Sequence, residues 1–182
     1  MLKPISLILV VILLIFKGIA IAQVGGGDMC SQAIAFNSDF LNGCPSVSPG
    51  NQFSNDPPNS AALDPSAPTP PGACVSATAG YDQWFFFDAV GTTGEVIVNP
   101  RTSLNVVIEV FSGTCGSLTT IGCMNIAGNN QIETLLLTGL TNATRYFFRI
   151  FGAANGAANR HGTFDFCGTN GAILTPPALP IE

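Results

Sequence analysis

The chain has 182 residues, of which only 9% are charged, and its formal net charge is −5. Both lysines lie within the first 17 residues, so the remainder carries four arginines against eleven acids, a formal charge of −7. An acidic chain without clustered basic residues is not expected to bind nucleic acid or to dock electrostatically on anionic lipid. Six cysteines beside a single histidine indicate three disulfides rather than a zinc site.

Residues 1–22 are typical of a secretory signal peptide. Lys3 gives a positive start, residues 5–16 form an apolar run, and Ala20-Ile21-Ala22 is a small-x-small cleavage site. The apolar run is too short for a typical membrane-spanning helix. Lys17 at its end leaves an uncleaved anchor as the alternative. Cleavage after residue 22 leaves 160 residues, which is enough for one domain in an oxidising compartment, secreted or on the cell surface.

The first part of the exported chain is irregular. Residues 30–44 have scattered apolar positions and predict one or two short strands. Proline, serine, asparagine and alanine dominate residues 45–72, which predicts a long irregular loop. Such a loop is uncommon inside a compact domain unless it is functional or cross-linked. Cys44 and Cys74 bracket it, so a disulfide across its ends is the simplest explanation.

From residue 81 onward the pattern is β throughout. Apolar and polar residues alternate within short runs, glycine and asparagine clusters separate the runs, and no helical period is sustained. We expect strands at 82–87, 95–99, 105–111, 118–123, 132–137, 145–151 and 163–167. This pattern predicts an all-β, antiparallel β-sandwich of about 7–9 strands over residues 23–168. The proline-rich residues 169–182 predict a stiff tail or linker.

The stretch from Leu140 to Tyr146 predicts a tyrosine corner. A leucine, a turn and a tyrosine that opens a strand follow one another there. In a tyrosine corner the phenol hydroxyl bonds to backbone a few residues upstream and fixes a crossover between sheets.

Several short motifs, each present once, follow one another along the chain. They are Asp28-x-Cys30-x-x-Ala33, Cys74, Asp82-Gln83-Trp84-Phe85, the run from Phe111 to Leu118, Cys123, the corner that ends at Tyr146, and the run from Gly162 to Cys167. This order resembles the bacterial pre-peptidase C-terminal-type β-sandwich modules of secreted proteins from Bacteroidota. The resemblance covers about residues 28–168. It implies a jelly-roll-like sandwich without catalytic residues, often found beside proteases or adhesins, and some relatives bind calcium or insoluble polymers.

The resemblance, together with the expected strand order, also implies a disulfide pairing. It joins Cys30 to Cys167, near the two ends of the domain, and Cys44 to Cys74 across the proline-rich loop. The third bridge would join Cys115 to Cys123 within a small hairpin.

The sequence shows none of the motifs typical of a hydrolase active site. A serine triad needs a histidine base, and His161 stands alone in an asparagine- and alanine-rich stretch with no Gly-x-Ser-x-Gly motif. Glu109, Glu133 and Asp165 occupy outward positions on expected strands, which predicts solvated side chains rather than a glycosidase carboxylate pair. We therefore expect no enzymatic activity.

Two kinds of ligand site remain open. Asp28, Asp82 and Asp88 lie near strand ends and are calcium candidates, and calcium is the one cofactor considered. The alternative is that these acids bond their own backbone in turns. Trp84 and Tyr81 are the candidates for a sugar-binding platform. Trp84 is favoured as a core residue and Tyr81 as a surface residue.

These observations favour a non-catalytic extracellular binding or adhesion module for a carbohydrate or a cell-surface partner. A structural subunit that self-associates into a layer or filament is one alternative, because unpaired edge strands permit assembly. An accessory domain of a secreted hydrolase is another. No membrane contact is expected after signal cleavage.

Overall fold

The computed structural model describes residues 27–36, 52–55, 63–71, 74, 80–153 and 160–170. Several predictions therefore fall outside the described residues: the signal peptide at 1–22, most of the tail at 169–182, and the environment of Cys44. Within the described part, no helix is long and apolar enough to cross a membrane.

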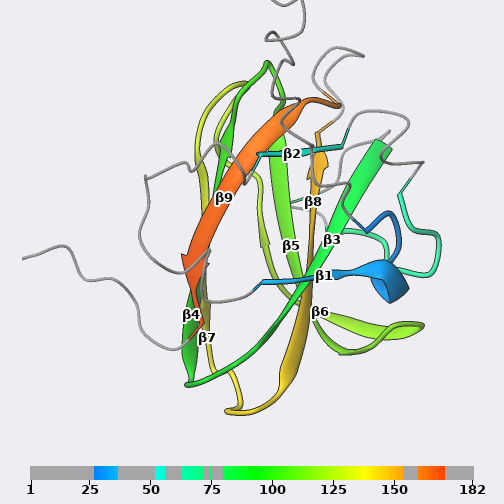
Figure 1. Ribbon diagram of the computed structural model, residues 1–182, viewed down its shortest axis with the longest axis vertical. Coiled ribbons are helices and arrows are strands. Elements are labelled where there is room, and N and C mark those ends of the chain that lie inside the picture. The colour runs from blue at the N-terminus through cyan, green and yellow to red at the C-terminus, as the bar shows by residue number, and fades with distance from the viewer. Residues whose placement is uncertain are drawn as a thin grey trace, which may run out of the picture.

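The described chain forms nine strands in two sheets that face one another (Figure 1). One sheet has the order β1-β3-β8-β5-β6 and the other the order β2-β9-β4-β7. The strands are β1 (Ile34–Ala35), β2 (Gln52–Ser54), β3 (Gly80–Asp88), β4 (Thr93–Pro100), β5 (Val106–Thr114), β6 (Ser117–Met124), β7 (Glu133–Thr138), β8 (Arg145–Gly152) and β9 (Thr163–Thr169), with a short 3₁₀ helix, η1 (Cys30–Gln32), before β1. The predicted all-β sandwich is confirmed. The jelly-roll detail stays a prediction.

Two short strands depart from the sequence prediction. β2 lies inside the stretch predicted to be irregular and pairs antiparallel with β9, with Phe53 opposite Phe164. β1 pairs parallel with β3, with Ile34 opposite Phe85, so the sandwich is not wholly antiparallel. A parallel pair needs a long connection, and the 44 residues between β1 and β3 allow it.

The core between the sheets follows the alternation of the strands. Buried and half-buried residues alternate along β4, where Val96 and Val98 point inward. Aromatic rings from both sheets meet at the centre. Phe85 stacks on Phe148 with ring centroids 5.1 Å apart, and Phe166 of the opposite sheet lies 4.5 Å from Phe85. Aromatic pairs at these separations stabilise a core beyond the burial of their area.

The predicted tyrosine corner is present. The Thr141 backbone N–H donates a hydrogen bond of 2.9 Å to the Tyr146 hydroxyl, five residues downstream. The Tyr146 ring is buried and stacks on Phe87 with centroids 5.6 Å apart. Ala143, inside the turn, has a left-handed φ of 60°.

The disulfide pairing that the resemblance implied is wrong. Cys30 joins Cys115 with Cα atoms 5.6 Å apart, and Cys74 joins Cys123 with Cα atoms 6.3 Å apart. These bonds exclude Cys30 with Cys167, Cys44 with Cys74, and Cys115 with Cys123. Cys167 is also disulfide-bonded, to a partner outside the described residues.

Strand geometry explains why the predicted hairpin bridge fails. Cys115 lies in the turn before β6 and Cys123 lies near its far end. Eight residues of extended strand separate their Cα atoms by roughly 26 Å. A disulfide requires Cα atoms within about 7 Å. The disulfides that do form indicate a non-cytoplasmic location.

Candidate functional site

The tryptophan considered as a sugar platform is fully buried. Trp84 lies on the outer face of the five-stranded sheet, in a small cluster with Phe111 and Cys30 that is separate from the core between the sheets. Its ring stacks on Phe111 at 5.3 Å, and its Nε1–H donates to Asp82 Oδ2 at 3.0 Å. Trp84 therefore presents no surface to a ligand in this structure. Tyr81 lies in β3, and its side chain is outside what the structure describes.

The three aspartates considered for calcium have different environments. Asp88 is exposed and accepts two hydrogen bonds from Arg145, of 2.8 and 2.9 Å, which hold the pKa of the Asp88 carboxyl below its usual value. Asp82 is fully buried, and Asp28 lies between Gly27 and η1. Among the described residues, no three histidine, cysteine, aspartate or glutamate side chains gather in a way that could hold a metal ion.

A buried ionic cluster occupies the middle of the outer face. Arg149 on β8 is 1% exposed and lies opposite both Trp84 on β3 and Glu109 on β5. Its Nε and Nη2 donate to Glu109 Oε2 at 3.0 and 2.8 Å, and its Nη1 lies 3.5 Å from Asp82 Oδ2. We call Arg149, Glu109 and Asp82 the ionic cluster.

Aromatic rings surround the guanidinium of the ionic cluster. The Arg149 Cζ atom lies 5.6 Å from the Trp84 ring centroid, 5.4 Å from that of Phe111 and 5.1 Å from that of Phe151. These distances are within the range of cation–π attraction. The rings also exclude water, which strengthens the ion pairs and makes an unpaired charge costly.

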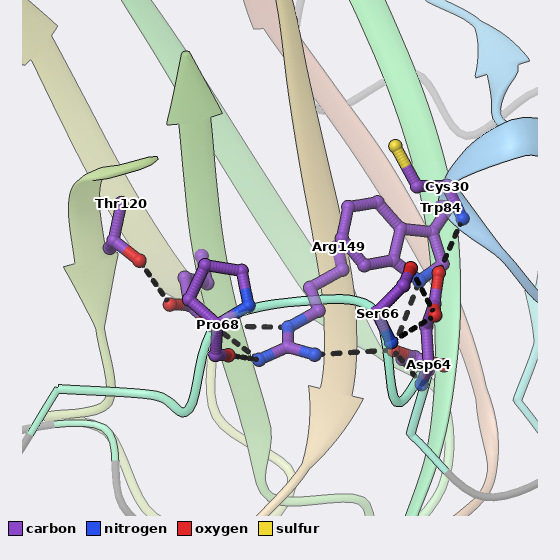
Figure 2. Close-up of polar contacts among 9 residues, drawn as sticks. Cys30, Asp64, Ser66, Pro68, Trp84, Thr120 and Arg149 are labelled. Carbon is purple, nitrogen blue, oxygen red and sulfur yellow. Dashed lines mark hydrogen bonds and ion pairs between the residues drawn. The ribbon is translucent and has the colours of Figure 1, made fainter. Parts of the chain in front are cut away.

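An irregular segment, residues 63–71, covers the ionic cluster, and we call it the cover segment. Its Asp64 N–H donates to Asp82 Oδ2 at 3.1 Å, and Arg149 Nη2 donates to the Pro68 carbonyl at 3.1 Å. Figure 2 shows the Arg149 guanidinium between Pro68 on one side and Asp64, Ser66 and Trp84 on the other. The cover segment is therefore fastened by hydrogen bonds to charged groups beneath it, which are stronger than neutral ones.

The N-terminal segment and β6 complete this cover. The Cys30 N–H donates to Asp64 Oδ2 at 2.8 Å, and Thr120 Oγ1 on β6 donates to Glu109 Oε1 at 2.8 Å. The two disulfides tie the same segments together, because Cys30 reaches Cys115 and Cys74 reaches Cys123. The outer face is thus closed by ionic, hydrogen-bonded and covalent links at once.

The pKa values of Asp82, in the ionic cluster, and Asp64, in the cover segment, are shifted in opposite directions. Burial raises the pKa of Asp82 to about 6, although hydrogen bonds from Asp64 and Trp84 and the charge of Arg149 oppose the rise. Burial would also raise the pKa of Asp64, but hydrogen bonds from Ser66 and Cys30 outweigh it and lower that pKa. The ionic cluster pairs the buried charge of Arg149 and holds the cover segment in place, which is a structural role.

The prediction that Glu109, Glu133 and Asp165 are solvated is wrong. Glu109 is buried in the ionic cluster, and Asp165 is buried and pairs with Arg101. Glu133 is also buried and bonds to backbone N–H groups. The available signal was that Val107 and Phe111 share the outward side of β5 with Glu109, so this strand is mainly apolar on both faces. A strand of that kind implies that its second face is covered too.

An exposed apolar loop connects the edge strands β6 and β7. Ile126 is 85% exposed, and Ile132 at the other end of this loop is 56% exposed. We call residues 125–132 the Ile126 loop. The Glu133 carboxylate accepts hydrogen bonds from the N–H groups of Ile126 and Ala127, at 2.7 and 2.6 Å. The Asn130 N–H donates to the Leu104 carbonyl at 3.0 Å. These hydrogen bonds fix the backbone of the loop, while the side chains of Ile126 and Ile132 remain exposed to solvent.

The sequence around the Ile126 loop is nearly free of charge. Glu133 is the only charged residue between Glu109 and Arg145, and it is buried. Exposed apolar side chains also occur on the flanking strands, Ile121 on β6 and Leu136 on β7. Sequence reasoning did not single out Ile126, and the available signal was an isoleucine within an asparagine- and glycine-rich turn.

No protein-family model matches this chain, and no curated protein matches it at a significant level.

Proposed function

We propose that this chain is a non-catalytic extracellular binding or adhesion module that contacts its partner through the Ile126 loop. The observation that carries the proposal is an isoleucine 85% exposed on a loop whose backbone is fixed by a buried carboxylate. Exposed apolar side chains cost solvation unless a partner covers them, and a preordered loop loses little entropy on binding. The resemblance to the pre-peptidase C-terminal-type modules supports the same role.

A cell-surface protein is favoured over a carbohydrate as the partner. Sugars are bound by stacking on flat aromatic rings, and Trp84 is buried beneath the cover segment. Aliphatic side chains such as Ile126 and Ile132 suit an apolar patch on another protein. Full burial of one isoleucine contributes about 1.5–3 kcal/mol to an interface.

The test is a binding assay with the chain purified from an oxidising host. Its saturable binding to beads coated with enzymatically deglycosylated cell-surface protein, and to cellulose and chitin beads, is compared with that of Ile126→Ser and Val90→Ser. Val90 is a matched control because it is also apolar, 68% exposed, and lies in the β3–β4 loop. We expect binding to the deglycosylated protein beads, abolished by Ile126→Ser and kept by Val90→Ser.

Two outcomes would count against this proposal. Equal losses in the two variants would show that the Ile126 loop is not the contact. Binding to cellulose or chitin alone, unaffected by Ile126→Ser, would favour a carbohydrate site elsewhere. Repeating the assay with a chelator tests calcium, because dependence on calcium would return Asp28, Asp82 and Asp88 to consideration as ligands.

A further inference from the structure

The four sheet edges in the described part of the chain differ in how well they are protected. β1 and β2 are edges of two and three residues, too short to template another strand. β6 is longer, but its register with β5 shifts at Ile121, which is a bulge, and disulfides lie just before it and near its end. A bulge twists an edge strand and interrupts its ladder.

β7 is the remaining edge, and it is long and regular. It pairs with β4 through six consecutive residue pairs, from Val98 with Glu133 to Thr93 with Thr138, without a register shift. Its side chains alternate: Leu135 and Leu137 are buried in the core, while Leu136 is 53% exposed on the outer face. A strand added beside β7 would continue the sheet and cover Leu136.

The β7 edge has no lysine or proline, and its single charged residue, Glu133, is the first residue of the strand. Natural edge strands carry lysine, proline or inward-pointing charge for this purpose. Glu133 shares the inward face with Leu135 and Leu137, and its carboxylate accepts hydrogen bonds from the N–H groups of Ile126 and Ala127 at the end of the strand, so Leu136 and its outward neighbours stay uncharged. Thr134, Leu136 and Thr138 occupy the outward positions.

We propose that β7 pairs antiparallel with β7 of a second copy of this chain, which joins two four-stranded sheets into one of eight strands. An antiparallel pair of identical strands satisfies a two-fold axis, so the edge is complementary to itself. The two Leu136 side chains then lie on the same face of the joined sheet, where neighbouring residues across a strand pair stabilise one another.

The charge distribution favours a second copy over a different partner. Beyond residue 17 the chain carries a formal charge of −7, so two copies repel one another where their acids meet. The stretch between Glu109 and Arg145 contains all of β7 and only one charged residue, the buried Glu133, so repulsion between copies is smallest there. A basic partner would find no complementary charge at this edge.

Analytical ultracentrifugation of the full exported chain, with disulfides intact, tests this pairing. Leu136→Lys introduces a like-charge pair across the two-fold axis, so we expect self-association to weaken by about tenfold or more. Thr119→Lys is the matched control, because Thr119 is an exposed residue on the other long edge strand, β6. It should leave the dimer constant unchanged, and thermal unfolding should show that both variants are folded.

Further measurements separate this dimer from the Ile126 contact. Ile126→Ser should leave self-association unchanged, and raising the salt concentration should strengthen it by screening the repulsion between acidic copies. Amide hydrogens of β7 should exchange more slowly as protein concentration rises. The proposal would be overturned if the wild-type chain stayed monomeric at about 100 times the protein concentration of the bead-binding assay. So would loss of the dimer in Thr119→Lys with retention in Leu136→Lys.

Discussion

The five-stranded sheet has two buried faces that are closed in different ways. Its inner face packs on the four-stranded sheet through apolar side chains such as Phe85 and Phe148. Its outer face buries Arg149 and Glu109 among aromatic rings beneath the cover segment. A second sheet supplies enough apolar area to close a face by burial alone. A short irregular segment does not, so the outer face also depends on ion pairs and disulfides.

Replacing Arg149 should show this difference most strongly. Arg149→Met leaves Glu109 and Asp82 buried without their cation, so we expect a loss of about 3–5 kcal/mol in the free energy of unfolding at pH 7. The loss should be smaller at pH 5, because Asp82, with a pKa of about 6, then carries little charge. Urea unfolding of the wild type and the variant at pH 5 and pH 7 measures both losses.

Two controls belong with the Arg149 variant. Phe148→Ala on the inner face should cost about 3–5 kcal/mol at both pH values, since only apolar packing is lost. Arg145→Met removes an exposed ion pair with Asp88 and should cost less than about 1 kcal/mol. A pH-independent cost for Arg149→Met would contradict an electrostatic role for Arg149.

The Cys30–Cys115 bridge should contribute next in size. Replacing both cysteines by alanine removes a link across 85 residues, and we expect a loss of about 2–4 kcal/mol, mainly from a less restricted unfolded chain. Calorimetry measures the fall in Tm, and peptide mapping of the wild type under non-reducing conditions checks the pairing. An unchanged Tm would show that the cover is held without this bridge.

Asp82→Asn tests the titration of the ionic cluster. The pKa of Asp82 is higher in the folded protein than its ordinary 3.8, so its contribution to stability is complete below that value and is lost as the pH rises through about 6. Between pH 4 and pH 7 the wild type should therefore lose up to about 3 kcal/mol relative to Asp82→Asn. Parallel stability curves for the two proteins would rule out this titration.

Tyr146→Phe should give the smallest change. It removes the hydroxyl that accepts from the Thr141 N–H and leaves the ring on Phe87, so we expect a loss of about 1 kcal/mol. The tyrosine corner joins β8 to the turn before it and lies away from the ionic cluster, so this loss should not depend on pH between 5 and 8. A cost above about 3 kcal/mol would indicate that the Thr141 N–H finds no water in the variant.

The inner face could be predicted from sequence, and the outer face could not. Alternation along β4 and the leucine, turn and tyrosine before β8 are local patterns, so they predicted the strand and the corner correctly. Glu109 was misjudged because its partner Arg149 is 40 residues away and meets it only through the register of β5 with β8. An outward position on a strand indicates solvent only when nothing covers that face.

The disulfides and the exposed loop were missed for a related reason. Cys115 and Cys123 are close in sequence, but a straight strand holds them apart, and each reaches a segment that covers the outer face. The position of the cover segment over β5, β6 and β8 depends on the tertiary fold, and the sequence spacing of the cysteines does not reveal it. Ile126 was overlooked because a single apolar residue in a turn has no periodicity.

The Cys30–Cys115 bond also decides how the chain would carry tension. Strands β1 to β5 all lie within the loop that this bond closes. A force that pulls on the chain from either side of the domain crosses from Cys30 to Cys115 through the sulfur atoms and bypasses these strands. At about 3.5 Å per residue, the bond withholds roughly 300 Å of chain length from stretching. The five strands inside this loop therefore cannot be drawn out to their full length until the bond is reduced.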